Sequence, residues 1–339
     1  MLPMTMRIAP CQQRYLIMGL LTILLITIFI AVNQGALPLS FKQLLALPFK
    51  DPMWQIWLHI RLPRVMLAVL VGMALATSGV VMQGVFRNPL ADAGLLGISS
   101  GAALCVGLLI VLPITLPSFL LVYGQITAAF IGGIVICLII YSLSHTSHGT
   151  ALLLLAGIAI NAITASMMGI LSYISDDQQL RQLSLWSMGY LGKGQWDLVL
   201  IAASLIIPAL WAALAISHRL NLLQLGDEDA HYLGVNVQRT KRQLIIITSL
   251  LIGTSVAVSG VISFIGLAVP HMLRLKIGTD HRWLVPATIL AGGSLLLIAD
   301  TLARTVAAPN EIPVGLFTSL IGGPYFLWLI LRKRGKHLC

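Results

Sequence analysis

Three consecutive acids, Asp227, Glu228 and Asp229, stand out in this 339-residue chain, which has only 11 acidic residues in all. Adjacent carboxylates lack the alternating spacing with which an EF-hand loop binds calcium, so a cation site is not favoured. In the first turn of a short helix they would instead complement the helix dipole. Gly226 precedes the run, and Gly234 suits the left-handed residue that ends a helix. The pattern predicts a short, negatively charged helix between these two glycines.

No motif for catalysis, metal binding or nucleotide binding is recognisable in the sequence. The triplet Gly192-Lys193-Gly194 lacks the glycine spacing and the Ser or Thr of a Walker A loop, so ATP cannot bind by that route. HExxH and GxSxG sequences do not occur, and the four cysteines form no CxxC pair. The eight histidines lie in loops or near the ends of apolar runs, which does not suit haem ligation within a membrane. We expect no catalytic residue, no metal site and no cofactor bound by this chain, which is not an enzyme.

A carrier driven by an ion gradient normally has acids deep within its membrane spans, because such groups are costly there and usually functional. Asp300 is the one candidate in the sequence, and Arg304 lies four residues on, on the same helical face. A structural ion pair at the end of a span is therefore expected. A gradient-driven secondary transporter stays open as the alternative to a transporter that a partner protein powers.

The composition is that of a protein that lies in lipid. Hydrophobic residues make up 58% of the chain, charged residues only 9%, and the mean hydropathy is +0.94. Long apolar runs between short polar breaks predict an all-α integral membrane protein. The net charge of +10 then reflects basic residues that flank the spans, and no nucleic-acid partner is expected. At about 20 apolar residues per span, we expect one domain, residues 1–339, with ten transmembrane helices near 14–34, 63–84, 95–112, 118–141, 150–173, 196–217, 240–258, 261–276, 284–300 and 313–331.

The basic residues predict the orientation of these spans. With the N-terminus in the cytoplasm, 14 of the 21 Lys and Arg residues fall on the cytoplasmic side, as the positive-inside rule requires. Both termini and the acidic run are therefore expected in the cytoplasm. The count of ten helices depends on Ser259-Gly260, which alone divides the seventh and eighth predicted helices.

A short pattern of small residues occurs twice. Gly72-x3-Ala76-x-Ser78-Gly79-Val80 recurs with identical spacing from Gly253 to Val261, in a helix of opposite predicted orientation. Transporters are often built from such inverted repeats. A chance recurrence is the alternative, because small residues are common where membrane helices pack.

Four segments of the chain have distinctive sequences. They are "RLPRVMLAVLVGMALATSGVVMQGVFRNPLADAGLLGISSGAAL" (61–104), "LRQLSLWSMGYLG" (180–192), "SGVISFIGLAVPHMLRLKIGTDHR" (259–282) and "LLIADTLARTVAAPNEIPVGLFTSLIGGPYFLWLI" (296–330). These segments resemble the permease subunits of bacterial ABC importers for vitamin B12, ferric siderophores and haem, the FecCD-type family. The resemblance covers nearly the whole chain beyond residue 50, and it is strongest to the haem-uptake permeases.

The resemblance implies a type II ABC importer permease in the bacterial inner membrane. Two copies, each with ten helices, would surround a central path in the lipid. Two cytoplasmic ATPase subunits would bind ATP-Mg, and a periplasmic binding protein would deliver the cargo. Haem is the expected cargo, with a ferric siderophore or vitamin B12 as the alternative.

The resemblance also implies roles for single residues. Asn161 is expected to face the path, although an interhelical hydrogen bond accounts for it equally well. The residues that match the docking site for the binding protein are Arg61, Arg64 and Arg304. Those that match the cytoplasmic gate are Gly149, Thr150 and Ala151. A coupling helix that contacts the ATPase is expected near 226–234, with Gly226, Asp227, Glu228, Asp229, Ala230, Leu233 and Gly234.

Overall fold

The structure is a computed structural model that describes residues 10–35, 48, 51–89, 91–112, 118–146, 150–192, 194–308 and 310–334. All regular elements within these ranges are helices, as the apolar runs predict. In chain order they are α1 (Pro10–Asn33), α3 (Pro52–Ile56), the π-helical turn η1 (Trp57–Arg61), α4 (Leu62–Val85), the 3-10 turn η2 (Ala93–Leu96), α5 (Ile98–Val111), α6 (Ser118–Thr146), α7 (Thr150–Ile174), α8 (Asp177–Ser187), α9 (Trp196–Leu223), α10 (Asp227–Tyr232), α11 (Val237–Ser259), α12 (Ile265–Ile277), α13 (His281–Thr305) and α14 (Val314–Arg334).

Each of the ten predicted ranges overlaps one of these helices. Among the described residues, seven helices are long and apolar enough to cross a membrane, which makes the chain a multi-pass membrane protein. Of the three remaining helices, α5 has 14 residues and α12 has 13, and the side chains of α14 are described only as far as Tyr325. The count of ten membrane crossings therefore stays a prediction.

The sequence predictions omit α3, η1, η2 and α8. Helix α8 begins at a capping box, in which the Asp176 side chain accepts from the Gln179 backbone N–H at 2.8 Å and the Gln179 side chain accepts from the Asp176 N–H at 3.1 Å. This helix is rich in glutamine and serine, so a search for 20-residue apolar runs does not find it.

The long apolar stretch is divided where Ser259-Gly260 predicts. Gly260 has φ +70° and ends α11, and a Cβ atom there would also overlap the Trp186 carbonyl oxygen. Phe264, likewise with a positive φ, immediately precedes α12. The predicted start of the eighth helix at residue 261 is therefore wrong, because the chain turns before Ile265.

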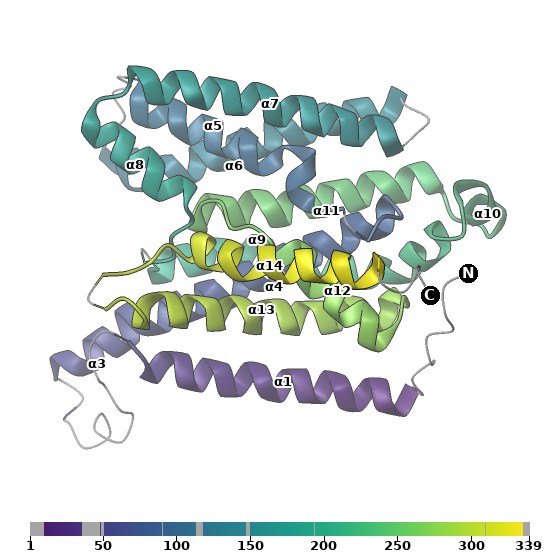
Figure 1. Ribbon diagram of the computed structural model, residues 1–339, viewed down its shortest axis with the longest axis horizontal. Helices are drawn as coiled ribbons and strands as arrows, with labels where there is room; N and C mark the ends of the chain where they lie inside the picture. Colours follow the sequence, from purple (N-terminus) through teal and green to yellow (C-terminus); the bar gives the residue numbers. More distant parts are fainter. Residues whose placement is uncertain are drawn as a thin grey trace.

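Helix α4 forms the centre of the bundle (Figure 1) and is buried along nearly its whole length. It packs against α9, α11, α12 and α13. A Cβ atom at Gly72 would overlap the Gly292 carbonyl of α13, and one at Gly79 would overlap the Gly266 carbonyl of α12. Small residues thus bring α4 into backbone contact with two neighbours, as is common in membrane bundles.

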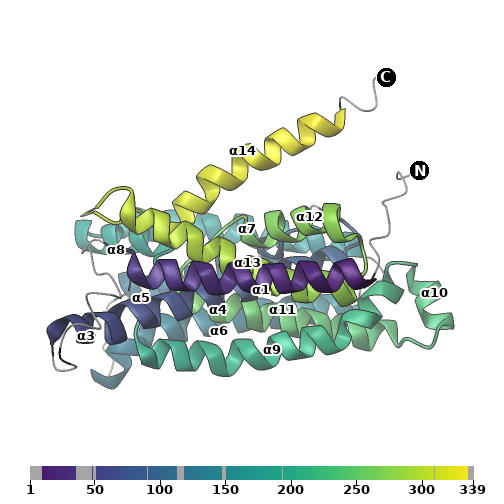
Figure 2. The same ribbon diagram turned by 90° about the horizontal axis from the view of Figure 1, so that it is seen from below.

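The two ends of the bundle are distinct. Helices α3 and α8 lie at one end and α10 at the other, the end at which α1 begins and α14 finishes (Figure 1). Seen from below, α14 projects away from the other helices (Figure 2).

The end of α4 and the start of α11 both lie beside α10, where Arg87 and Lys241 pair with Asp227, so the two helices run in opposite directions, as predicted for the repeated pattern of small residues. The two copies nevertheless pack differently. Gly79 lies inside α4, whereas its counterpart Gly260 ends α11. A Cβ atom at Gly72 would overlap α13, whereas one at Gly253 would meet no atom within 4 Å.

Candidate functional site

Three arginines and two carboxylates form a cluster at the α3–α8 end, here called the arginine–carboxylate cluster (Arg61, Arg64, Asp300, Arg304 and Glu311). Arg64, in the first turn of α4, lies between the two carboxylates. Its Nη2 donates to Asp300 Oδ1 at 2.9 Å, and its Nη1 donates to both Glu311 oxygens at 2.9 and 3.0 Å. The Arg64 side chain is 10% exposed and that of Asp300 only 1%. Charges this buried need hydrogen-bonded partners. Since Arg64 finds them in α13 and in the segment before α14, the cluster connects α4 to both.

The other two arginines attach α1 to this cluster. Arg304 Nε lies 3.7 Å from Asp300 Oδ2, which confirms the predicted pair, and Arg304 Nη2 donates to a carbonyl in the last turn of α1. Arg61 Nη1 donates to the carbonyls of Val32 and Asn33 at 3.3 and 3.2 Å. Such carbonyls at the end of a helix have no partner within the helix.

The structure therefore brings the three predicted docking arginines together, but it buries all of them within the chain. Their docking role stays a prediction. The sequence does not reveal the partners of Arg64, because Asp300 and Glu311 lie 236 and 247 positions away from it.

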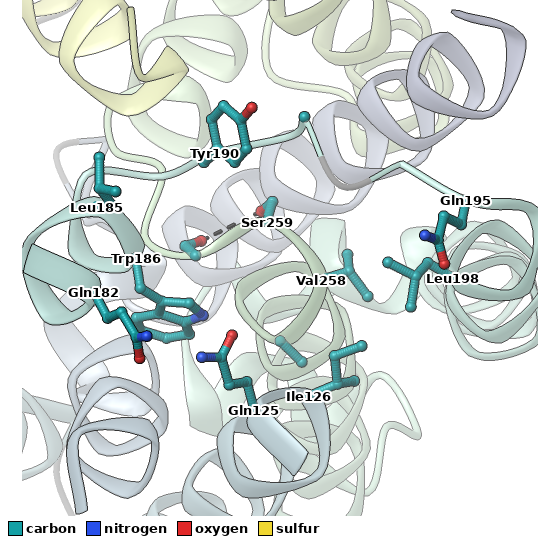
Figure 3. A pocket seen from close by; sticks show the side chains of 13 residues that line it. Gln125, Ile126, Gln182, Leu185, Trp186, Tyr190, Gln195, Leu198, Val258 and Ser259 are labelled. Atoms are coloured by element: carbon teal, nitrogen blue, oxygen red, sulfur yellow. Dashed lines mark hydrogen bonds between the residues drawn. The ribbon is translucent and has the colours of Figure 1, made fainter. Parts of the chain in front are cut away.

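A cavity of about 590 Å³ lies at the same end, lined by α6, α8, α9, α11 and the segment after α8. Its walls carry the amides of Gln125, Gln182 and Gln195 beside Trp186 and aliphatic side chains (Figure 3). No charged residue, histidine or cysteine is among its described lining residues. Such a neutral wall can hold polar groups weakly, but it offers no strong metal ligand.

Tyr190 connects this cavity to the arginine–carboxylate cluster. It lines the cavity, and Figure 3 shows its hydroxyl turned away from Gln125 and Trp186. That hydroxyl donates a hydrogen bond to Glu311. Burial, the negative charge of Glu311 and this hydrogen bond raise the pKa of Tyr190, so the hydroxyl stays protonated and remains a donor.

Helix α10 confirms the short charged helix that the sequence predicts. Its three acids occupy the first turn, and Gly234 has φ +85°. The Gly234 N–H donates to the His231 carbonyl at 2.9 Å, and the Val235 N–H donates to the Ala230 carbonyl at 3.0 Å. These bonds satisfy the last carbonyls of the helix, as in a Schellman motif.

Asp227 fastens α10 to the bundle. It forms ion pairs with Arg87, just beyond α4, and with Lys241 of α11, whose Nζ lies 2.6 Å from the carboxylate. Arg87 also donates to the Leu223 carbonyl at 2.8 Å, and its backbone is left-handed, with φ +51°. Left-handed backbone is uncommon outside glycine, so the side-chain contacts of Arg87 hold its backbone in an unfavourable conformation.

The rest of α10 faces outward. Glu228 and Asp229 are exposed, Tyr232 is 86% and Leu233 57% exposed, and only Ala230 is buried. The helix is therefore fixed on one side and presents two carboxylates, an aromatic ring and a leucine on the other. An exposed apolar and acidic patch of this kind is typical of a binding surface.

Asn221 joins the end of α9 to the start of α13 near the same end. Its amide donates to Asp280 at 2.6 Å, and its oxygen accepts from the His281 backbone N–H at 2.8 Å. Asp280 also caps α13 by accepting from the Arg282 N–H at 3.0 Å. Burial alone would raise the pKa of Asp280, but the hydrogen bonds and the charge of Arg282 lower it on balance.

Two predicted sites are less well defined. Gly149 lies outside the described residues, Thr150 begins α7, and the side chains of Thr150 and Ala151 are not described. Asn161 shares a hydrogen bond with Ser100 and donates to the Gly94 carbonyl at 3.3 Å. The interhelical hydrogen bond, one of the two alternatives for Asn161, is therefore present.

No group of three or more possible metal ligands occurs in the part of the chain that the structure describes.

Comparisons with known proteins identify the family. Residues 23–332 match the model of the FecCD transport family. This chain belongs to that family. It is 61% identical to the hemin transport system permease protein HmuU of Yersinia pestis, over 96% of this chain and 98% of that protein. It is 39% identical to the vitamin B12 import system permease protein BtuC of Klebsiella pneumoniae, over 96% of each chain.

A solved structure confirms the fold of this family member. A metal-chelate type ABC transporter in an inward-facing conformation aligns with a TM-score of 0.85 and 32% identity, over 94% of this chain and 99% of that one. The chain thus has the fold of an ABC transporter permease, and its relatives are transport subunits rather than enzymes.

Proposed function

We propose that this chain is the permease subunit of an ATP-driven importer that carries haem into the cytoplasm. The observation that carries the proposal is its 61% identity, over almost its full length, to a hemin permease. The sequence and the geometry of α10 support ATP hydrolysis by a separate subunit as the energy source. The chain has no Walker A motif, and α10 presents an exposed acidic and aromatic surface on which a separate ATPase could act.

The proposed assembly is a homodimer in the bacterial inner membrane with two ATPase subunits, which bind ATP-Mg. Each copy would cross the lipid ten times, with an inverted repeat and with both termini and α10 in the cytoplasm. A periplasmic binding protein would dock at the opposite end, over the arginine–carboxylate cluster. The gate would lie at residues 149–151, and Asn161 would border the path. No cofactor is bound by this chain itself.

Two alternatives are weaker. A ferric siderophore or vitamin B12 could be the cargo, and the 39% identity to a vitamin B12 permease supports the second. A gradient-driven carrier would need an acid that gains and loses a proton during transport. Asp300 is a poor candidate, because Arg64 and Arg304 both bind it.

Transport by purified components tests the proposal. The permease and its ATPase are reconstituted in proteoliposomes, and hemin uptake is measured with the cognate periplasmic binding protein. We expect uptake to require ATP on the ATPase side and to survive an ionophore. Uptake that an ionophore abolishes, or that proceeds without ATP, would contradict it. Competition distinguishes the possible cargoes: hemin uptake is measured in the presence of excess ferric siderophore or excess vitamin B12.

A further inference from the structure

The two carboxylates that hold Arg64 differ in how easily another group could replace them. Asp300 lies in α13, and its side chain is 1% exposed. Glu311 lies between α13 and α14, outside any helix, and its side chain is 32% exposed. Asp300 is therefore a fixed partner of Arg64, whereas Glu311 can be reached from outside the bundle.

The two carboxylates also bind different nitrogens of the Arg64 guanidinium group. Asp300 accepts from Nε and Nη2, and Glu311 accepts only from Nη1. If Glu311 leaves, Asp300 still compensates the buried charge of Arg64. A second carboxylate could then take the Nη1 position without leaving a buried charge unpaired.

Glu311 also restrains the segments around it. It accepts the Tyr190 hydroxyl, and Tyr190 lines the cavity at this end. Four residues further on, in the first turn of α14, Gly315 leaves no room for a Cβ atom between the carbonyls of Met188 and Val261. Release of Glu311 would therefore remove its contact with Tyr190, in the same segment against which the start of α14 packs.

We propose that Glu311 is an internal substitute for a carboxylate of the docking protein. On docking, an acidic side chain of the periplasmic binding protein takes Arg64 Nη1, and Glu311 is released, which also frees the Tyr190 hydroxyl. This inference rests on the proposed function, because it needs docking at Arg64. A carboxylate suits the position, since a hydrogen bond between a guanidinium N–H and a carboxylate joins two opposite charges and is stronger than a neutral one. Glu311 thus weakens docking and connects it to the wall of the cavity.

Binding affinity tests this exchange. The permease–ATPase complex is placed in lipid nanodiscs, and the Kd of its cognate binding protein is measured with and without hemin. We expect Glu311→Gln to lower the Kd roughly fivefold, the upper range for a partly exposed ion pair, and to raise ATP hydrolysis in the absence of the binding protein. Asp177→Asn is the matched control, because Asp177 is an exposed acid of α8 at the same end. Its Kd should equal that of the wild type.

Tyr190→Phe gives a second test that changes no charge. It loosens Glu311 and should also lower the Kd, by less than Glu311→Gln does. An unchanged or higher Kd in both variants overturns the inference, and so does a gain by Asp177→Asn equal to that of Glu311→Gln. The result also separates the two proposals. If the wild-type complex binds no docking protein, the proposed function fails, whereas normal binding with no gain in the variants sinks only the role of Glu311.

Discussion

Arg64 shows how much a single side chain depends on the rest of the fold. It is buried beside Asp300 and Glu311, and without them its charge would be very costly in that position. The local pair of Asp300 and Arg304 could be predicted, since residues four apart meet on one face of a helix. The longer-range partners could not, because the sequence does not show which helix ends lie together.

Replacing Arg64 tests the cost of the buried charge. Arg64→Met should lower the free energy of unfolding by roughly 3–5 kcal/mol, because it leaves Asp300 with one weaker partner. The double variant Arg64→Met/Asp300→Leu should recover much of that loss, since both charges are gone. Thermal unfolding in detergent measures both. A double variant less stable than Arg64→Met would contradict this explanation.

Asp280 predicts a dependence of stability on pH. Because its pKa is lower in the folded protein than in the unfolded chain, its contribution is present above the unfolded pKa of about 3.9 and is lost as the pH falls through the folded value. Asp280→Ala also removes the cap of α13, which should cost about 1 kcal/mol at neutral pH. The difference in melting temperature from the wild type should shrink between neutral pH and pH values below 3.9. A constant difference across that range would show that the charge of Asp280 does not contribute.

Helix α4 is the element that joins the two ends of the bundle for which we propose functions. Arg64 lies in its first turn and Arg87 just beyond its last, a separation of roughly 35 Å at the α-helical rise. Between them the helix contacts α12 and α13 through Gly79 and Gly72. A displacement at the arginine–carboxylate cluster can therefore reach α10 through one closely packed helix.

Arg87 is the residue through which α4 should act on α10. Arg87→Ala removes the ion pair with Asp227 and the bond to the Leu223 carbonyl. We expect the stimulation of ATP hydrolysis by the binding protein to fall several-fold. Arg239→Ala is the matched control, an exposed arginine near the start of α11. Equal loss in the two variants would mean that positive charge at this end matters and the contact to α10 does not.

The exposed face of α10 should be needed for the ATPase to bind. Glu228→Ala/Asp229→Ala leaves the anchoring acid Asp227 in place, so α10 should remain folded while the permease no longer copurifies with the ATPase. Asp227→Ala should instead keep the ATPase bound but uncouple it, because α10 loses Lys241 and Arg87. Copurification and hemin uptake distinguish the two outcomes. Normal ATP-driven uptake by the first variant would exclude this surface.

At the scale of the whole molecule, lipid explains what the sequence could predict. Helices that face hydrocarbon need long apolar runs, so each of the ten ranges overlaps a helix. The central place of α4 could not be predicted, because inner and outer helices are equally apolar in a membrane. The polar helix α8 and the short turn η2 contain no long apolar run, so the sequence does not predict them. In the candidate site, α10 was predictable from its acids and glycines, whereas Glu311 and Tyr190 depend on contacts between distant segments.

The long separation between Arg64 and Asp300 has a consequence for biosynthesis. A ribosome adds about 5–20 residues per second, so α4 emerges roughly 10–50 s before the carboxylate that neutralises it is made. During that interval Arg64 has no carboxylate partner at the end of its span, which is unfavourable there, and we expect α4 to wait at the translocon or the membrane surface. Nascent chains that stop near residue 290 should leave a cysteine placed at Thr77 open to a water-soluble thiol reagent. Full-length chains released from the ribosome should protect it. Equal protection at both lengths would show that α4 inserts without its partner.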